Sequence, residues 1–431
     1  MLNPQMNLVK QVFDRTAVAD IRAEVFGEME RCGARNRLKP GQSVAITAGS
    51  RGITNIGRIT RALVEFLRDC GAEPFIFPAM GSHGGGTAEG QKSLIATFGI
   101  TEKEMGCPLL SDMEVEEIGR TPDGLPVFVD RHALSADHIL VLNRVKPHTK
   151  FEGPIESGLM KMMAIGMGKR HGADLYHKAC IQLGMNRVIE TAGLMVLDKC
   201  RILCGVGLVE NGYHQTAIIR ALRPDEVFEE EKALLKEARG RMARIPFPDI
   251  DLLIIDEMGK NISGTGMDTN VTGVNRDILG GFSSEPRTRR LFIRDLAPGS
   301  DGNALGVGLA DFTTRRLVDK IDRKKTYTNC LTAISPEKGA IPIYFDTDRE
   351  CLEAAFGSLG MVDSEGVRVV HIKNTLSLET LHLSRAYEPQ IRANPNLEIL
   401  CEWEPLAFGP DDQLVSPFPM RGLAEVLSRK S

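Results

Sequence analysis

The sequence lacks an excess of basic residues and long apolar runs, and each absence excludes a class of protein. Lysine and arginine number 53 against 57 acidic residues, which gives a net charge of -4 with histidine neutral. Without surplus positive charge, neither nucleic acid nor an anionic membrane surface is expected as a principal partner. No apolar run approaches the roughly 18 to 20 residues that span a bilayer. We therefore expect neither a nucleic-acid-binding protein nor a membrane protein.

Close cysteine pairs are also missing. The nine cysteines are odd in number and widely scattered, and the nearest two are Cys200 and Cys204, with no Cys-x-x-Cys motif anywhere. This pattern argues against a disulfide framework, a zinc ribbon and a four-cysteine iron–sulfur cluster. The first residues also lack the apolar core and cleavage site of a signal peptide. Reduced, buried thiols in a cytoplasmic protein are the resulting expectation.

The length of the chain favours two domains. A chain of 431 residues exceeds the size at which a single core usually stops growing. Apolar runs alternate with amphipathic segments and glycine turns along most of it, which is typical of α/β domains. Two prolines in IPFPDID suggest a boundary. We predict an N-terminal α/β domain over 1–246, a smaller C-terminal α/β domain over 247–405, and a tail over 406–431 that contains a helix.

Strands, glycine turns and helices follow one another in the first domain. The run SVAITAGS predicts a buried strand that ends at Arg51, and PFIFPAMG predicts another that leads to His83 in a glycine-rich turn. HILVLNRV predicts a third, followed by His148. Ligands of parallel α/β sheets bind beyond the carboxyl ends of the strands, where these side chains fall. Helices are expected over 14–33, 59–71, 184–200 and 223–243, after Thr87 as a cap, and in the second domain over 313–325.

The stretch from Asn143 to Cys180 combines unusual residue types. It has three histidines, four methionines, several glycines and five lysines. Methionines in such a run more often pack in a core than ligate a metal. Lys161 lies among them in LMKMMAI, where an amine must snorkel, form a pair or be used covalently. Metal-ligating, covalent and anion-holding side chains mixed with apolar packing are typical of the wall of a buried cofactor site.

Taken together, GSRG, GSHGGG, KPHTKFEGPIESGLMK and YHK resemble the lactate racemase family of nickel-pincer nucleotide-dependent isomerases. The resemblance covers most of the chain and is most specific across 45–180. It implies two α/β domains with the active site between them. It also implies a cofactor made by maturation proteins, a nicotinic-acid-derived mononucleotide whose two thio-groups and ring carbon hold nickel.

The resemblance assigns the cofactor contacts residue by residue. Lys161 is implied as the lysine that tethers the nucleotide, with Lys169 and Lys150 as alternatives because the tether motif is longer here than in the racemase itself. His177 is implied as the nickel ligand, and His171 competes for that role. Imidazole is a suitable nickel ligand when it is neutral.

The resemblance also assigns the catalytic and substrate contacts. His83 and His148 are implied as the acid/base pair, and Arg51, helped by Lys260, as the charge that receives the substrate carboxylate. The implied activity is racemisation or epimerisation of a 2-hydroxy acid by hydride transfer, with histidines moving the hydroxyl proton. Alternatives are an epimerase of a polyol with the same cofactor, and a non-catalytic anion-binding or nucleotide-binding protein.

Two departures from the family pattern bear on the substrate. Ala48 and Gly52 stand where the arginine motif has an acid and a proline, and the loop 262–275 lacks the expected Gln and Lys pair. The polar run Asp268, Thr269 and Asn270 in this loop suits a larger hydroxy acid or a sugar-derived substrate better than lactate.

Overall fold

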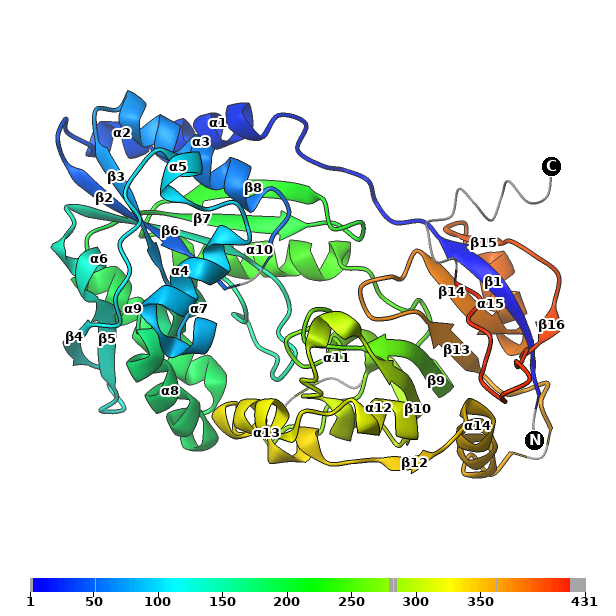
Figure 1. Ribbon diagram of the computed structural model, residues 1–431. Coiled ribbons are helices and arrows are strands. Elements are labelled where there is room, and N and C mark those ends of the chain that lie inside the picture. Colours follow the sequence, from blue (N-terminus) through cyan, green and yellow to red (C-terminus); the bar gives the residue numbers. More distant parts are fainter. Residues whose placement is uncertain (1–2, 51, 279–281, 283–284, 362, 419–431) are drawn as a thin grey trace. The chain divides into compact units, whose positions relative to one another are not determined.

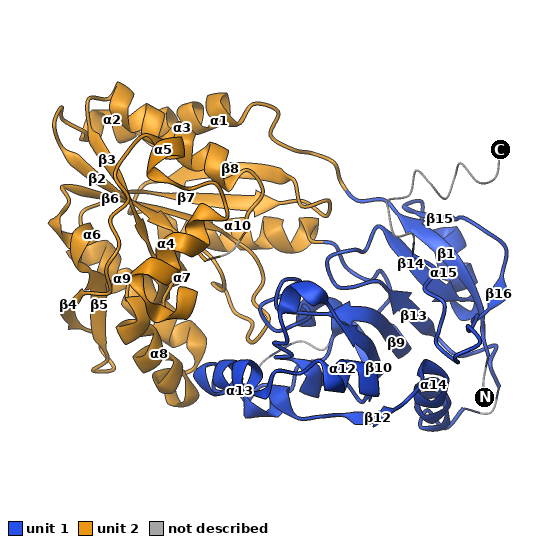
Figure 2. Cartoon of the chain, in the orientation of Figure 1, with its two compact units in different colours: residues 1–13, 243–431 blue, residues 14–242 orange. Residues whose placement is uncertain are grey.

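The chain folds into two compact units of mixed α/β structure (Figures 1 and 2). The computed structural model describes residues 3–50, 52–278, 282, 285–361 and 363–418. Asp14–Met242 make up one unit, and Met1–Phe13 with Ala243–Ser431 the other. Both units alternate strands and helices, so the prediction of two α/β domains is confirmed. The tail helix expected near the C-terminus falls on 419–431, outside the described residues.

A parallel sheet forms the centre of unit 14–242. Within the described residues the strand order is β3-β2-β6-β7-β8, parallel from β3 to β7, with β8 antiparallel at the end. Three of these strands are the apolar runs predicted from the sequence, and their residues are almost wholly buried. The strands are β2 (Ser43–Ala48), β3 (Glu73–Pro78), β6 (His138–Arg144), β7 (Ile202–Glu210) and β8 (Thr216–Leu222).

Helices pack against this sheet and contribute residues to its core. On α3, apolar residues recur at helical spacing, and eight of its residues are buried. The first helix begins at Ile21 rather than at residue 14, because the Asp20 side chain caps it by accepting a hydrogen bond from the Ala23 amide. The helices are α1 (Ile21–Arg31), α2 (Ala34–Arg37), α3 (Ile56–Asp69), α4 (Ala88–Ala96), α5 (Glu102–Met105), α6 (Arg131–Ser135), α9 (Met185–Lys199) and α10 (Val227–Arg241), with a small hairpin of β4 (Val115–Arg120) and β5 (Pro126–Asp130).

The methionine-rich stretch is helical and buried. It forms α7 (Leu159–Lys161), the π-helical turn η2 (Met162–Gly166) and α8 (Lys169–Leu183) in succession. Met160, Met163 and Met167 are completely buried, and Met162 nearly so. Core packing therefore accounts for the methionines. A π turn widens the helix locally and is often found at functional sites.

The second unit is built on a larger mixed sheet. Its order within the described residues is β12-β11-β10-β9-β13-β14-β1-β15, with β16 paired to β1. The segment from β12 to β13 is parallel, and β14, β1 and β15 are antiparallel additions. The strands are β1 (Gln5–Gln11), β9 (Asp249–Met258), β10 (Arg287–Leu296), β11 (Phe312–Thr314), β12 (Ile343–Phe345), β13 (Val369–Ile372), β14 (Thr380–Ser384), β15 (Leu397–Ile399) and β16 (Glu404–Pro405).

The N-terminal strand belongs to this second sheet. β1 pairs with β14 through five residue pairs that run from Met6–Ser384 to Lys10–Thr380, and with β15 on its other edge. Residues 5–11 therefore lie in the unit that we expected to begin at residue 247. The pairing joins residues 370 to 378 positions apart, and nothing in the local sequence indicates it.

One predicted helix of the second unit is wrong. Residues 313–325, expected as a single helix, form strand β11 followed by two short helices. The side chains of Thr314 and Asp322 each accept a hydrogen bond from an amide three residues later, and each therefore begins a separate helix. The helices of this unit are α11 (Thr269–Thr272), α12 (Arg315–Asp319), α13 (Arg323–Thr332), α14 (Asp348–Gly357) and α15 (Glu388–Ala393). Across the described residues, no helix is long and apolar enough to cross a membrane.

Candidate active site

The carboxyl ends of three adjacent parallel strands carry the predicted site residues of unit 14–242. β3, β2 and β6 are neighbours in the sheet and run in one direction, so the loops that follow them emerge at a common edge. His83 lies five residues after β3 and His148 four residues after β6. Arg51, predicted after β2, lies outside the described residues.

A buried amide holds the loop of His83. The Gln91 side chain, completely buried on α4, donates through Nε2 to the carbonyls of Gly81 at 2.9 Å and of His83 at 3.3 Å. Thr87 caps α4 as predicted, by accepting a hydrogen bond from the Gly90 amide at 3.1 Å. Nothing in the sequence indicates that Gln91 holds this loop. Its amide fixes the backbone on both sides of a histidine whose side chain is exposed.

The imidazole of His83 has a defined orientation. Its Nδ1 lies 2.9 Å from the Met80 carbonyl oxygen. A carbonyl oxygen can only accept, so Nδ1 of His83 carries a proton in this contact.

The glycine-rich loop packs on the helix that carries His177. The Gly81 amide donates to the Gly166 carbonyl at 3.3 Å, and a Cβ at Gly81 would lie 3.2 Å from Cβ of Ala173. Ala173 and His177 are four residues apart on α8 and therefore share a face. Gly84, at φ +64°, leaves no room for a side chain, since a Cβ would come within 2.7 Å of the Gln91 amide nitrogen. The loop thus joins the His83 turn closely to the methionine-rich helix.

The loop of His148 is fastened by a buried carboxylate. Glu156 is 1% exposed and accepts hydrogen bonds from the backbone amides of His148 and Gly153, the second at 3.1 Å. Arg239 on α10 forms an ion pair with the same carboxylate. Burial raises the pKa of Glu156, and the two amides and Arg239 oppose that rise. The loop therefore has a rigid support inside the protein.

The ring of His148 and the amine of the tether candidate both lie against Phe151. Its Nδ1 accepts a hydrogen bond from the Lys150 amide at 3.1 Å. The ring packs on Phe151 with 4.4 Å between centroids. The amine of Lys161 lies 5.9 Å from the centroid of the same phenylalanine. Phe151 therefore contacts both the predicted proton carrier and the predicted tether.

A second buried carboxylate holds the first turn that carries Lys161. Glu231 on α10 accepts a hydrogen bond from the Met160 amide at 2.8 Å through Oε2. Burial raises its pKa to about 7, and the amides of Leu159 and Met160 limit the rise. Gly158 is required beside it, because a Cβ there would lie 2.1 Å from Oε1 of Glu231. Although α10 is rich in charged residues, one side of it is buried and supports the site.

His177 is held in its neutral form. Burial is the largest cause that lowers its pKa to about 4, and the positive charges of Lys150 and Lys161 lower it further. Among the described residues its Nδ1 is buried and has no hydrogen-bond partner. The structure therefore brings Lys150, Lys161 and His177 within electrostatic reach of one another.

The alternative residues are engaged elsewhere. The amine of Lys169 is completely buried, 2.9 Å from Asp130 Oδ2 and 2.6 Å from the Pro78 carbonyl oxygen. His171 is exposed and meets Phe128 edge-on, with 4.4 Å between centroids.

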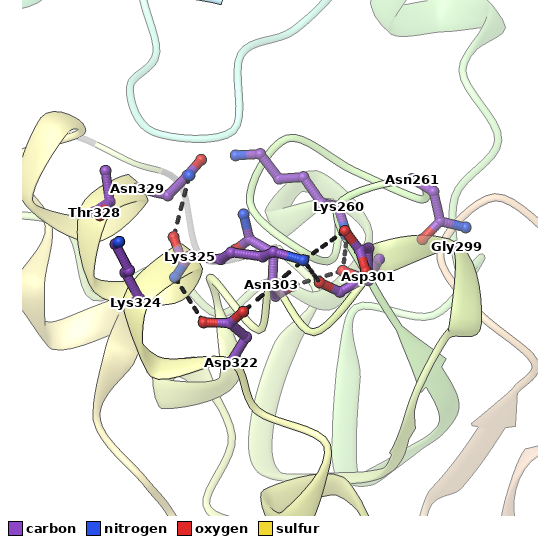
Figure 3. Close-up of a pocket in the computed structure, with 11 residues that line it drawn as sticks. Lys260, Asn261, Gly299, Asp301, Asn303, Asp322, Lys324, Lys325, Thr328 and Asn329 are labelled. Carbon is purple, nitrogen blue, oxygen red and sulfur yellow. Dashed lines mark hydrogen bonds and ion pairs between the residues drawn. The ribbon is translucent and has the colours of Figure 1, made fainter. Parts of the chain in front are cut away.

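Lys260 borders an open pocket of about 740 Å³ in the second unit (Figure 3). Its amine donates to the Gly264 carbonyl at 2.6 Å. Across the pocket, Lys325 forms an ion pair of 2.6 Å with Asp301. The lining is rich in lysine and amide side chains: Lys260, Asn261, Gly299, Ser300, Asp301, Asn303, Asp322, Lys324, Lys325, Thr328 and Asn329.

The polar run that we expected to face substrate stabilises its own loop. Oδ1 of Asp268 accepts hydrogen bonds from the Asn270 amide at 3.0 Å and from its side-chain nitrogen at 2.9 Å. Asp268, Thr269 and Asn270 are all buried. Asp268 and Asn270 thus form hydrogen bonds within the turn that begins α11.

In the part of the chain that the structure describes, no three histidine, cysteine or acidic side chains are grouped so that they could hold a metal ion.

Comparison with known proteins gives a family and a fold. Residues 22–187 match the family model of the lactate racemase N-terminal domain. The structure of the lactate racemase apoprotein from Thermoanaerobacterium thermosaccharolyticum is similar at 14% identity with a TM-score of 0.52, covering 84% of this chain and 93% of that one. A crystal structure of a protein from Thermotoga maritima is similar at 13% identity with a TM-score of 0.50, covering 76% and 84%. No curated protein sequence matches significantly.

Proposed function

This chain belongs to the lactate racemase family, and we propose that it is a racemase or epimerase of a 2-hydroxy acid, either lactate-like or a larger sugar acid. The proximity of Lys161 and His177 is the observation that carries the proposal. The lysine charge acts on an imidazole whose pKa is lowered to about 4. These are the two side chains that a tethered nickel-pincer nucleotide requires close together.

The residues present fit such a cofactor. A metal ligand must be an unprotonated nitrogen, and His177 is neutral at any pH well above 4. Its Nδ1 is buried and has no hydrogen-bond partner among the described residues. Buried polar atoms are usually hydrogen-bonded, so this exception needs an explanation, which a bound group would provide. Lys161 would hold the nucleotide covalently and His177 would ligate nickel. The pincer would bring the remaining donors, so a single protein ligand is sufficient.

When bound, this cofactor supplies a hydride acceptor that makes the carbon bearing the hydroxyl planar. The protein supplies proton transfer and orientation. His83 and His148 would move the hydroxyl proton. Glu156 and Gln91 hold the backbone beside these histidines through hydrogen bonds, which limits the motion of the histidines during the reaction. Arg51 and Lys260 remain the side chains predicted to receive the substrate carboxylate.

Intact-mass analysis tests the proposal. The full chain would be produced together with cofactor maturation proteins, and digestion would locate any adduct. We expect a nucleotide-sized adduct on the peptide that contains Lys161. It should be absent from Lys161→Met and present in Lys150→Met, which is matched because both amines act on His177. An unmodified chain without nickel, made with the maturation proteins present, would contradict the proposal and favour a binding protein.

The substrate can be found with the same preparation. We would screen 2-hydroxy acids and aldonic acids for loss of optical rotation. Activity on one of these acids is expected only for protein that carries the adduct. Racemisation by protein without adduct or nickel would contradict the cofactor assignment.

A further inference from the structure

Two histidines lie side by side on neighbouring strands of the second unit. His371 on β13 is directly opposite His382 on β14 in the antiparallel register. Residues paired in this way project from the same face of a sheet, and the centroids of the two rings are 5.7 Å apart. His371 is completely buried and His382 is half-buried. The two imidazoles therefore occupy one place on the sheet.

Each ring has a nitrogen without a hydrogen-bond partner. Within the described part of the chain, Nδ1 of His371 and Nδ1 of His382 are both buried and form no hydrogen bond. Most buried polar atoms of side chains are hydrogen-bonded, so each exception needs an explanation. Two such nitrogens on adjacent rings indicate a bound group that the surrounding side chains do not supply.

A carboxylate determines which nitrogen of His371 carries the proton. Nε2 of His371 lies 2.6 Å from Oδ1 of Asp256 on β9. The same carboxylate forms an ion pair with Arg294 and accepts a hydrogen bond from the Ser416 hydroxyl at 2.6 Å. Asp256 is therefore the acceptor and Nε2 the donor, so in the neutral ring Nδ1 has a lone pair and no proton. Histidines that ligate metals usually have this arrangement, with a carboxylate bonded to the other ring nitrogen.

We propose that His371 and His382 bind a zinc ion, with Nδ1 of each ring as a ligand. Bonds of about 2.0–2.1 Å from zinc to two imidazole nitrogens place the ring centroids roughly 5–6 Å apart, and the observed separation of 5.7 Å lies in this range. No third histidine, cysteine or acidic side chain of the described residues is grouped with them for metal binding. Water completes the coordination, which suits zinc because its filled d shell imposes no geometry. This site is independent of the proposed function.

The ion would connect β13 and β14 beneath the last described residues. Phe418 meets the ring of His371 edge-on, with 5.1 Å between centroids, and Ser416 is bonded to Asp256. A metal that binds the folded chain and not the unfolded chain stabilises the fold. Zinc should therefore raise the melting temperature of the protein.

Zinc binding by the full-length chain tests the proposal. The protein would carry His177→Ala, would have no histidine tag and would be made without the maturation proteins, so that the predicted nickel site does not contribute. We expect calorimetric titration to show one zinc ion per chain and Tm to rise by at least about 3 °C. X-ray absorption at the zinc edge should show two imidazole nitrogens.

Two variants in this background locate the site. His382→Ala should weaken zinc binding at least about tenfold and abolish the rise in Tm; its Nδ1 has no hydrogen bond to lose among the described residues. His371→Gln should do the same, because its amide can still donate to Asp256 but offers no imidazole. His132→Ala, which removes a histidine paired with Asp112 in the other unit, should bind zinc normally.

The inference is overturned if the protein with both histidines binds no zinc, since water alone would then occupy the space beside the two nitrogens. It is also overturned if His382→Ala binds zinc as tightly as the protein with both histidines. Neither result depends on racemase activity, so failure of this inference is distinct from failure of the proposed function.

Discussion

Lys169 and Asp130 form a completely enclosed ion pair. Their charged atoms are 2.9 Å apart and both side chains are 0% exposed. The lysine amine also donates to the Pro78 carbonyl, at the end of β3. The carboxylate accepts a hydrogen bond from the Ala133 amide and so begins α6. This pair and the bond to Pro78 tie the start of α8 to the end of β3.

Removing the lysine of this pair should destabilise the protein. Lys169→Met leaves an unpaired carboxylate inside the unit, and breaking a buried ion pair in this way costs roughly 3–5 kcal/mol. The free energy of unfolding in urea measures the effect. Lys178→Met, on an exposed side chain of the same helix, should change it by no more than about 0.5 kcal/mol. The double variant Asp130→Asn/Lys169→Met should regain much of the loss, because it removes the unpaired charge. A small effect of Lys169→Met alone would show that the pair is not enclosed in solution.

Glu231 makes stability depend on pH near neutrality. An unfolded glutamate has a pKa of about 4.3, whereas burial raises that of Glu231 to about 7 in the folded chain. Between these values the folded state binds more protons than the unfolded state, so stability falls as pH rises. The contribution is fully present below pH 4 and is lost as pH passes 7. Its size is on the order of 3 kcal/mol.

The Glu231→Gln variant isolates this effect. Its amide oxygen can still accept from the Met160 amide, but the side chain no longer titrates. We expect the wild type to lose stability relative to the variant between pH 5 and pH 8. Urea titrations at both pH values measure the two free energies of unfolding. Glu230→Gln, at an exposed position of the same helix, should follow the wild type at both pH values. Parallel pH profiles for wild type and Glu231→Gln would mean that Glu231 is not buried as described.

The sequence predicts the strands and loops of the site better than the groups that support them. β2, β3 and β6 are short apolar runs that end in glycine or proline turns, and these local signals mark His83 and His148 directly. Gln91 and Glu231 carry no such signal. Glu231 bonds an amide 71 residues earlier in the chain, and a charged helix such as α10 looks solvated when only its own sequence is considered. The position of β1 could not be predicted for the same reason, because β1 pairs with a strand that is distant in the sequence.

The same limit applies to the choice among neighbouring lysines and histidines. Residue type and spacing could not separate Lys161 from Lys169, or His177 from His171. The structure shows that the residues of each pair lie in different environments. Lys169 forms an enclosed ion pair, and His171 is exposed. The orientation of each side chain depends on the phase of the helix across the π turn Met162–Gly166, which ordinary helical periodicity does not predict.

His177 and His171 lie on one helix and provide a matched test of nickel binding. In matured protein, His177→Ala should lose at least about tenfold of its nickel, measured by elemental analysis against chain concentration, because it removes the predicted protein ligand. The organic adduct on Lys161 should remain by intact mass. His171→Ala, which removes an exposed ring packed on Phe128, should keep both nickel and adduct.

The low pKa of His177 makes this prediction pH-specific. With a pKa of about 4, the imidazole needs no deprotonation before it ligates a metal at neutral pH, so nickel content of wild-type protein should be constant from pH 6 to pH 8 and fall only as pH approaches 4. Nickel lost already near pH 6.5, the ordinary pKa of histidine, would indicate an exposed ligand such as His171. If His177→Ala retained nickel, another side chain would be the metal ligand. The proposal that Lys161 and His177 hold the same cofactor would then be wrong.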